Sequence, residues 1–302
     1  MISKNIKRRV TVVLGIAVLS FIINGCGGGG GSSSPQASAP TEKEQAPITQ
    51  QNSKAVSAVA TDSIQLGFGA QRTSGGGLFK ITGETQTDTA ALNLIRNTIR
   101  LDKRVEGYCE KGFIDVTNAS STSGTVTFSN CQTNNMIYDG TVTVSTNSSQ
   151  TSFSATYSDF KITDLTDNAY VYFESMKLSF KKDDYRITEL TVAMDGYAED
   201  NGERIDYRNY NFNMNLSTTD MMRITVNGYI KTKCLDGWIG IKTDRTVITS
   251  NNDACPIAGK IMVDGQDSSL EMTFNSDHSI DVTVAGETTH YTDCSELESA
   301  CN

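Results

Sequence analysis

The stretch NYNFNMNLS, from Asn209 to Ser217, alternates a large apolar residue with an asparagine at every step. Residues two apart in an extended strand share a face, so the apolar residues would face a core. The asparagines would form a polar strip about 20 Å long on the opposite face. Asparagine is a poor strand former, so this strip is either a surface that contacts sugar hydroxyls or amides, or a solvated face. Its members are Asn209, Asn211, Asn213 and Asn215.

The same two-residue period governs the chain from about Tyr108 onward. It recurs in TVTF (125–128), TVTVS (141–145), SFSATY (152–157), YVYF (170–173), MKLSF (176–180), ELTVAM (189–194), MRITV (222–226), LEMTF (270–274) and SIDVTV (279–284). Turn-forming residues separate the runs. This pattern is typical of antiparallel strands with one buried face. It predicts a mainly all-β fold, an antiparallel meander that forms a barrel, half-barrel or roll.

Two segments before the strands have helical periodicity, at residues 53–71 and 87–105. In the second, Leu92, Ile95 and Ile99 recur at helical spacing, and Thr87 or Asp88 can cap its start. We expect one or two short helices that pack on the sheet.

The N-terminus begins with a basic stretch followed by VTVVLGIAVLSFIING from Val10. The length of this apolar run is typical of the central region of a signal peptide and short for a membrane span. The run ends at Ile23-Asn24-Gly25-Cys26, an aliphatic residue, a tolerant position, a small residue and a cysteine.

These four residues resemble the lipobox of bacterial lipoproteins. The resemblance implies cleavage after Gly25 and lipidation of Cys26, with residues 1–25 as the signal peptide. By the sorting rule of that family, Gly27 in place of aspartate implies anchoring at the outer membrane. The alternative is an ordinary secretory signal. The resemblance does not extend to the strands, and it leaves open which side of the membrane the protein faces.

Residues 26–53 are rich in glycine, serine and proline and predict a flexible linker, followed by a folded domain over 54–302. The first 25 residues hold four of the 26 basic residues and none of the 35 acidic ones, so the remainder carries a formal charge of −13. This charge argues against nucleic acid as a partner. The expected partners are the membrane, through the lipid, and an envelope glycan or another envelope protein.

Six cysteines remain besides Cys26, an even number that predicts disulfides in an exported chain. A weak repeat suggests their pairing: CEKGFIDV begins at Cys109 and CLDGWIGI at Cys234, and another cysteine lies 22 and 21 positions later. If each stretch folds as a hairpin, Cys109 pairs with Cys131 and Cys234 with Cys255, which leaves Cys294 for Cys301. The repeat also predicts a duplication over about 108–165 and 233–285.

The sequence predicts no catalytic residue, metal site or cofactor. It has no G-x-S-x-G, H-E-x-x-H or phosphate-binding glycine loop. We therefore expect a non-catalytic binding or structural role. Aromatic residues in YVYF and around Trp238 are candidate stacking platforms for sugars, although Trp238 also fits a structural role. Two alternatives remain: a glycan hydrolase, and a carrier of lipid or another hydrophobic molecule in a half-open barrel lined by Met176, Met194, Met214, Met222, Met262 and Met272.

Overall fold

The computed structural model describes residues 37–72, 103–105, 107–120, 122–149, 151–166, 168–183, 187–200, 202–216, 221–250 and 255–297. Within these ranges there are one α-helix, two short 3-10 helices and fourteen strands. They are η1 (Glu42–Glu44), α2 (Ser53–Arg72), β1 (Lys103–Val105), β2 (Lys111–Thr117), β3 (Ser123–Thr133), β4 (Met136–Thr146), β5 (Ser152–Asp164), β6 (Tyr170–Lys182), β7 (Ile187–Asp200), β8 (Glu203–Leu216), β9 (Met221–Thr232), β10 (Trp238–Ser250), β11 (Ala258–Gly265), β12 (Ser268–Phe274), β13 (Ile280–Val284), β14 (Glu287–Tyr291) and η2 (Cys294–Glu296).

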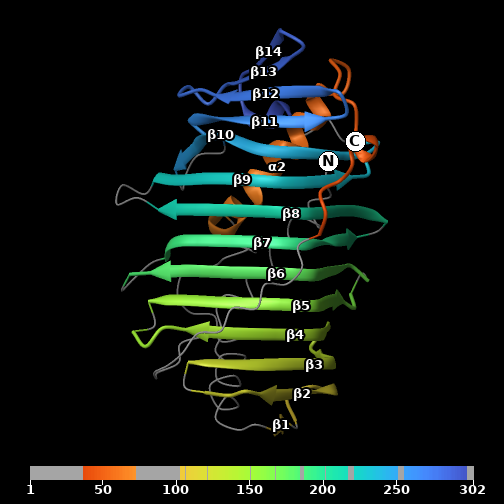
Figure 1. The fold of residues 1–302 in the computed structure, drawn as a ribbon, viewed down its shortest axis with the longest axis vertical. Coiled ribbons are helices and arrows are strands. Elements are labelled where there is room, and N and C mark those ends of the chain that lie inside the picture. Colours follow the sequence, from red (N-terminus) through yellow and green to blue (C-terminus); the bar gives the residue numbers. More distant parts are fainter. Residues whose placement is uncertain are drawn as a thin grey trace.

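All fourteen strands belong to one sheet, in which each strand pairs with its neighbours in the sequence (Figure 1). Every ladder is antiparallel, so the predicted meander is confirmed. The sheet is open, with β1 at one end and β14 at the other, and has the form of a half-barrel or roll rather than a closed barrel.

The two-residue period places one face of the sheet in the core. In β9 buried residues alternate with exposed or half-buried ones over the whole strand, and in β13 they alternate with half-buried ones. The buried residues of β4 to β14 form a single cluster together with α2, and β2 and β3 add a smaller one. We call the buried side the inner face and the opposite side the outer face.

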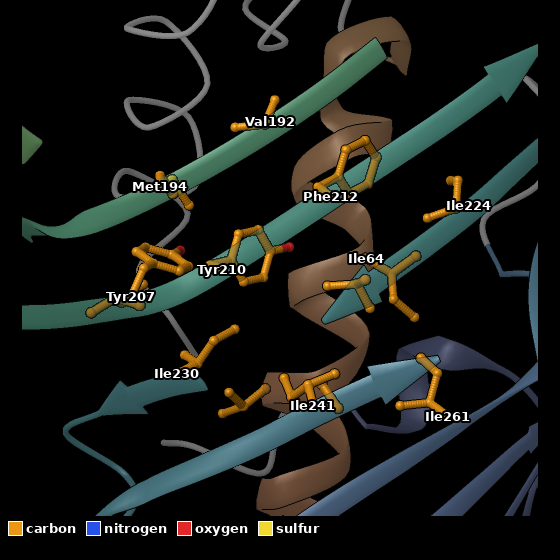
Figure 2. Packing of buried hydrophobic residues seen from close by; sticks show 14 of the residues in the cluster. Ile64, Val192, Met194, Tyr207, Tyr210, Phe212, Ile224, Ile230, Ile241 and Ile261 are labelled. Carbon is orange, nitrogen blue, oxygen red and sulfur yellow. The ribbon is translucent and has the colours of Figure 1, made fainter. Parts of the chain in front are cut away.

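Helix α2 confirms the first predicted helix and lies on the inner face, where it contacts β8, β9 and β13. Figure 1 shows it crossing behind the strands. Ile64 is fully buried against the sheet (Figure 2). The hydroxyl of Tyr210 donates to the carbonyl of Ser63 at 2.8 Å. The second predicted helix lies outside the described residues except for its last three, which form β1 and not a helix.

The predicted linker is wrong in its last part, because residues 41–52 are bound to the sheet. We call them the N-terminal strap. The N–H of Ala46 donates to the carbonyl of Trp238 and the carbonyl of Ala46 accepts from Gln266, so the strap lies between β10 and the end of β11. A Cβ at Gly237 would lie 2.6 Å from Ala46 N, and one at Gly265 would lie 2.2 Å from Ala46 O. These two glycines leave the room that the strap occupies, and the sequence pattern gave no sign of it.

A recurring unit builds most of the sheet. In five strand pairs a glycine of one strand lies against the main chain of the other. The pairs are β2–β3, β4–β5, β6–β7, β8–β9 and β10–β11. A Cβ at Gly140 would lie 2.3 Å from the carbonyl oxygen of Asp159, and the φ of Gly140 is +119°. Register shifts accompany these contacts in the ladders from β2 to β11, except the one between β5 and β6. Together they form a band of bulges across the sheet, which we call the bulge band.

The disulfides correct the predicted pairing. Cys109 and Cys131 are bonded as predicted, since β2 and β3 form the expected hairpin. Cys255, however, is bonded to Cys294, which excludes both Cys234–Cys255 and Cys294–Cys301. Cys234 is also in a disulfide, and its partner lies outside the described residues.

The second pair fails because the expected turn near residue 245 is absent. Residues 238–250 form one strand, β10, which places Cys234 and Cys255 at its opposite ends, about 40 Å apart. Cys255 instead precedes β11, at the end of the sheet where β14 finishes and η2 carries Cys294. The two cysteine-led segments are therefore not equivalent: Cys131 lies in the second strand of a hairpin, β3, whereas Cys255 follows the single strand β10.

Candidate functional site on the outer face

The outer face carries polar and aromatic side chains that the core does not use. The bulge band divides this face in two. On the side of the hairpins that join β5 to β6 and β7 to β8 lie tyrosines and charged residues. On the other side lie rows of serine, threonine and asparagine.

One row crosses the aromatic half from strand to strand in register. Its members are Asp139, Lys161, Tyr172, Tyr197, Asp206, Lys231 and Trp238, one from each of β4 to β10. We call it the tyrosine row. Because successive strands lie about 4.8 Å apart, this single row samples seven strands in a line perpendicular to them.

Three tyrosines and an arginine gather around the middle of this row. They are Tyr170 and Tyr172 of β6, Tyr197 of β7 and Arg204 of β8, and we call them the tyrosine cluster. The rings of Tyr172 and Tyr197 are 5.4 Å apart, and those of Tyr170 and Tyr197 are 5.8 Å apart, centroid to centroid. The Cζ atom of Arg204 lies 3.6 Å from the centroid of Tyr197. The three rings are thus held as one unit by contacts across strands.

Carboxylates fix the polar ends of the cluster. The hydroxyl of Tyr170 donates to Glu199 Oε2 at 2.8 Å, and that of Tyr172 donates to Asp159 Oδ1 at 2.9 Å. Asp206 accepts from Arg204 through both Nε and Nη2, at 2.8 and 2.6 Å. Such fixed side chains lose little conformational freedom when a ligand binds.

Electrostatics keep both tyrosine hydroxyls protonated. Burial raises the pKa of Tyr170 to about 12, and the hydrogen bond to Glu199 adds to the shift. The hydrogen bond to Asp159 is the main cause that raises the pKa of Tyr172 to about 12. The pKa of Arg204 is raised by its hydrogen bond to Asp206. The cluster therefore keeps its donors and its cation across the physiological pH range.

The other half of the outer face holds an uncharged row. It consists of Ser123, Ser145, Ser154, Ser179, Thr191, Asn213 and Thr225, one from each of β3 to β9. We call it the hydroxyl row. Two of its side chains are joined by a hydrogen bond, in which Thr191 Oγ1 donates to Asn213 Oδ1 at 3.0 Å. This row contains the middle of the asparagine strip.

The predicted strip is correct for three of its four asparagines. Asn211, Asn213 and Asn215 face outward on successive alternate positions of β8. Asn209 is displaced because it occupies a bulge, with a φ of +50°, and its N–H donates to Asp195 Oδ1 at 2.6 Å. The bulge explains how Tyr207 and Tyr210, three apart, both face the core.

Trp238 is buried and helps to hold the N-terminal strap on the sheet. It is 7% exposed, the guanidinium of Arg208 lies 4.6 Å from its ring centroid, and its carbonyl accepts from the strap. The repeat had matched it to Phe113, which is half-buried on β2. Of the predicted platforms, the tyrosines of YVYF lie in the cluster. The sequence did not place Tyr197, Glu199 and Arg204 beside these tyrosines, because only strand register brings them together.

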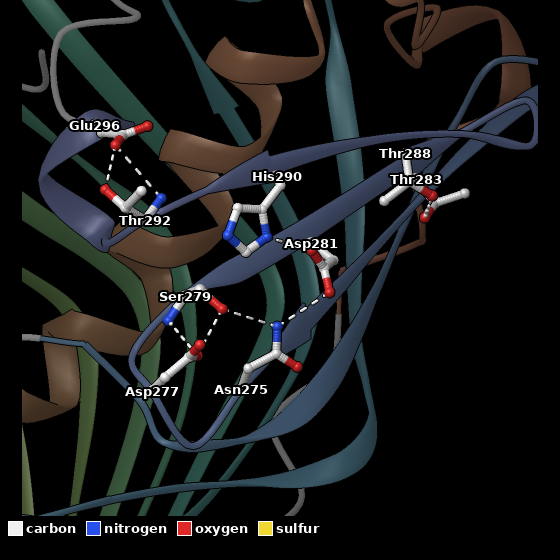
Figure 3. A network of polar contacts seen from close by, with 9 residues as sticks. All are labelled: Asn275, Asp277, Ser279, Asp281, Thr283, Thr288, His290, Thr292 and Glu296. Atoms are coloured by element: carbon white, nitrogen blue, oxygen red, sulfur yellow. Dashed lines mark hydrogen bonds and ion pairs between the residues drawn. The ribbon is translucent and has the colours of Figure 1, made fainter.

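A second polar network lies at the β14 edge (Figure 3). His290 Nδ1 is 2.8 Å from Asp281 Oδ1, and Asn275 donates to Asp281 and Ser279. The hydroxyl of Ser279 donates to Asp277 at 2.6 Å. Ser279 is therefore engaged with Asp277 and Asn275 rather than with His290, and this network is not a serine–histidine–aspartate triad.

A carrier of hydrophobic molecules would hold its ligand on the inner face of the sheet. Five of the six methionines predicted to line it are buried in the core, but Met262 alternates outward on β11. Where α2 packs, apolar side chains of the helix and sheet fill the space between them (Figure 2). The carrier role stays a prediction for the remainder of the inner face.

Among the described residues, no helix is long and apolar enough to span a bilayer, and no group of three or more His, Cys, Asp or Glu side chains is placed to hold a metal. No protein-family model matches the chain, and no curated protein matches it either.

Proposed function

We propose that this protein is a lipoprotein of the bacterial outer membrane, anchored through Cys26, which binds an envelope component through the outer face of its sheet without catalysis. The anchor rests on the resemblance of residues 23–26 to a lipobox. The binding role rests on the tyrosine cluster.

The cluster carries the proposal because its side chains are aromatic, outward-facing and fixed. The aromatic residues of the inner face are explained by the core. Those of the cluster lie on the opposite side and are oriented by carboxylates. Cross-strand aromatic pairs also stabilise sheets, by about 0.2–1 kcal/mol each. A test must therefore separate binding from stability.

The anchor is tested on the full chain expressed in a bacterium with an outer membrane. We expect mass spectrometry to find an acylated Cys26 at the mature N-terminus and the protein to fractionate with the outer membrane. Cys26→Ser should abolish both. A mature N-terminus without lipid would exclude the anchor.

Binding is tested by retrieving envelope components with the detergent-solubilised full chain. Wild type should retain a component that the Tyr172→Ala/Tyr197→Ala variant does not, at equal thermal stability. Lys177→Ala/Arg223→Ala, which alters exposed positions across the bulge band, serves as the matched control. Equal recovery by all three proteins would remove the outer-face role.

A further inference from the structure

We infer that the tyrosine row binds an extended, uncharged glycan chain, which lies across β5 to β9 perpendicular to the strands. This inference rests on the proposed function and names the class of ligand for the same site.

The chemistry of the row matches a sugar. A pyranose presents an apolar C–H face and a ring of hydroxyls, so it needs aromatic surface beside fixed donors and acceptors. The tyrosine cluster offers two rings at 5.8 and 5.4 Å from that of Tyr197, flanked by a guanidinium and three carboxylates that are already oriented. Aromatic and polar groups occur here on neighbouring strands of one surface.

The charges of the row favour an uncharged ligand. Cations and carboxylates are matched along the row, with Lys161 and Lys231 against Asp139 and Asp206, and Arg204 beside the row is paired with Asp206. No surplus of cations remains to attract an anionic polymer, and the acidic character of the chain repels one. A neutral glycan meets neither obstacle.

The apolar content of the outer face argues against a protein partner. Protein interfaces have an apolar core that is excluded from water. In the described part of the chain, Leu165 is the one large hydrophobic residue that is exposed, and it lies in the loop between β5 and β6. Between β5 and β9 the aromatic surface of the row consists of tyrosine rings, which suits a sugar better than a protein.

The spacing of the row fits a polymer. Strands lie about 4.8 Å apart, close to the length of one sugar in an extended chain, so each strand from β5 to β9 can meet one unit. The hydroxyl row runs parallel to the tyrosine row on the other side of the bulge band, outside the line that the glycan would follow.

The test is calorimetry of the detergent-solubilised full chain with hexamers of β-1,4-linked glucose and of β-1,4-linked N-acetylglucosamine, with chondroitin sulfate as the anionic comparison. We expect at least one neutral hexamer to bind and chondroitin sulfate not to. Tyr172→Ala/Tyr197→Ala should weaken binding by about tenfold or more, which corresponds to about 1.4 kcal/mol. The control variant Lys177→Ala/Arg223→Ala should stay within about twofold of wild type.

Three outcomes would overturn the inference. The first is equal hexamer affinity of the wild type and the double tyrosine variant. The second is tighter binding of chondroitin sulfate than of either hexamer. The third is binding of neither hexamer, in which case the envelope retrieval decides what remains: a protein retained through the tyrosines preserves the proposed function, and no retained component removes both.

Discussion

His290 and Asp281 show how register creates an interaction that sequence neighbours do not reveal. They are nine residues apart and face each other across β13 and β14. Their hydrogen bond raises the pKa of His290 and lowers that of Asp281. Both side chains are exposed, at 58% and 38%, so the effect belongs to the local edge of the sheet.

The pair gives a testable pH dependence. The raised pKa of His290 means that its contribution is complete below the ordinary histidine value of 6.5 and is lost as pH rises through the folded pKa. The lowered pKa of Asp281 means that its contribution is present above 3.8 and is lost as pH falls. The pair should be fully formed between these limits. In an NMR titration, Asp281→Asn should lower the pKa of His290.

Glu287→Gln on the same strand is the control and should leave the His290 titration as in wild type. An unchanged His290 titration in Asp281→Asn would contradict the hydrogen bond.

Residue identity predicted the outer and inner faces well but could not predict where the alternation shifts. Asn209 illustrates the limit, because nothing in NYNFNMNLS marks a bulge. The signal lies on another strand: the buried Asp195 accepts from the N–H of Asn209 and from Ser175. Asp139 does the same for the N–H of Asn130. A carboxylate fourteen or nine residues away thus satisfies the spare donor of a bulge.

At the scale of elements, strands and the first helix followed from periodicity, whereas strand length did not. β10 runs through the position where a turn was expected, and this single error changed two disulfides. The turn-forming residues near position 245 favour a break in the strand, but pairing of β10 with both β9 and β11 keeps it extended. The tyrosine cluster depended equally on register between β6, β7 and β8, which one sequence does not fix.

The corrected disulfides give the second prediction. Peptide mapping without reduction should recover Cys109 linked to Cys131 and Cys255 linked to Cys294. Replacing Cys255 and Cys294 by alanine should lower the free energy of unfolding by about 3–4 kcal/mol, since the bond closes a loop of 39 residues. Urea denaturation measures the change. A linked Cys234–Cys255 peptide would refute the pairing described here.

The third prediction concerns the close contacts between glycines and the main chain of the neighbouring strand in the bulge band. Gly140→Ala introduces a Cβ beside the Asp159 carbonyl and a positive φ, and should cost at least about 2 kcal/mol. Gly202 also has a positive φ, but nothing lies within 4 Å of its missing Cβ. Gly202→Ala should therefore cost only the backbone term, about 1 kcal/mol. Equal losses in urea denaturation would mean that the close contact is unimportant.

At the scale of the molecule, the strap changes how the body relates to its expected anchor. Pro40 is buried and the strap follows at once, so only about 14 residues separate Cys26 from the folded body. Fully extended, they span no more than about 50 Å. The sequence suggested a longer tether because proline and polar residues continue into the strap. The glycines that make room for the strap, Gly237 and Gly265, lie about 190 and 220 positions further along the chain.

The fourth prediction tests the docking of the strap. Ala46 is 1% exposed, so Ala46→Glu would bury an unpaired carboxylate and should release the strap. Hydrogen exchange should then accelerate at the amides of Ala46 and Gln266 while β5 to β8 stay protected. Lys43→Glu, at an exposed position in η1, is the matched control. Similar exchange in both variants would show that the strap is not held at Ala46.

The glycine-against-carbonyl contact has a consequence for how such a sheet grows. The contact recurs in every second strand pairing from β2–β3 to β10–β11, and Asp139 and Asp195 complete bulges between these pairs. A two-stranded unit of this kind could be gained or lost while the register of the strands on either side is kept. This is possible because the sheet is open and β1 does not have to pair with β14. The width of the molecule would then be a count of modules, open to change by duplication, and the breadth of its outward surface would change with it.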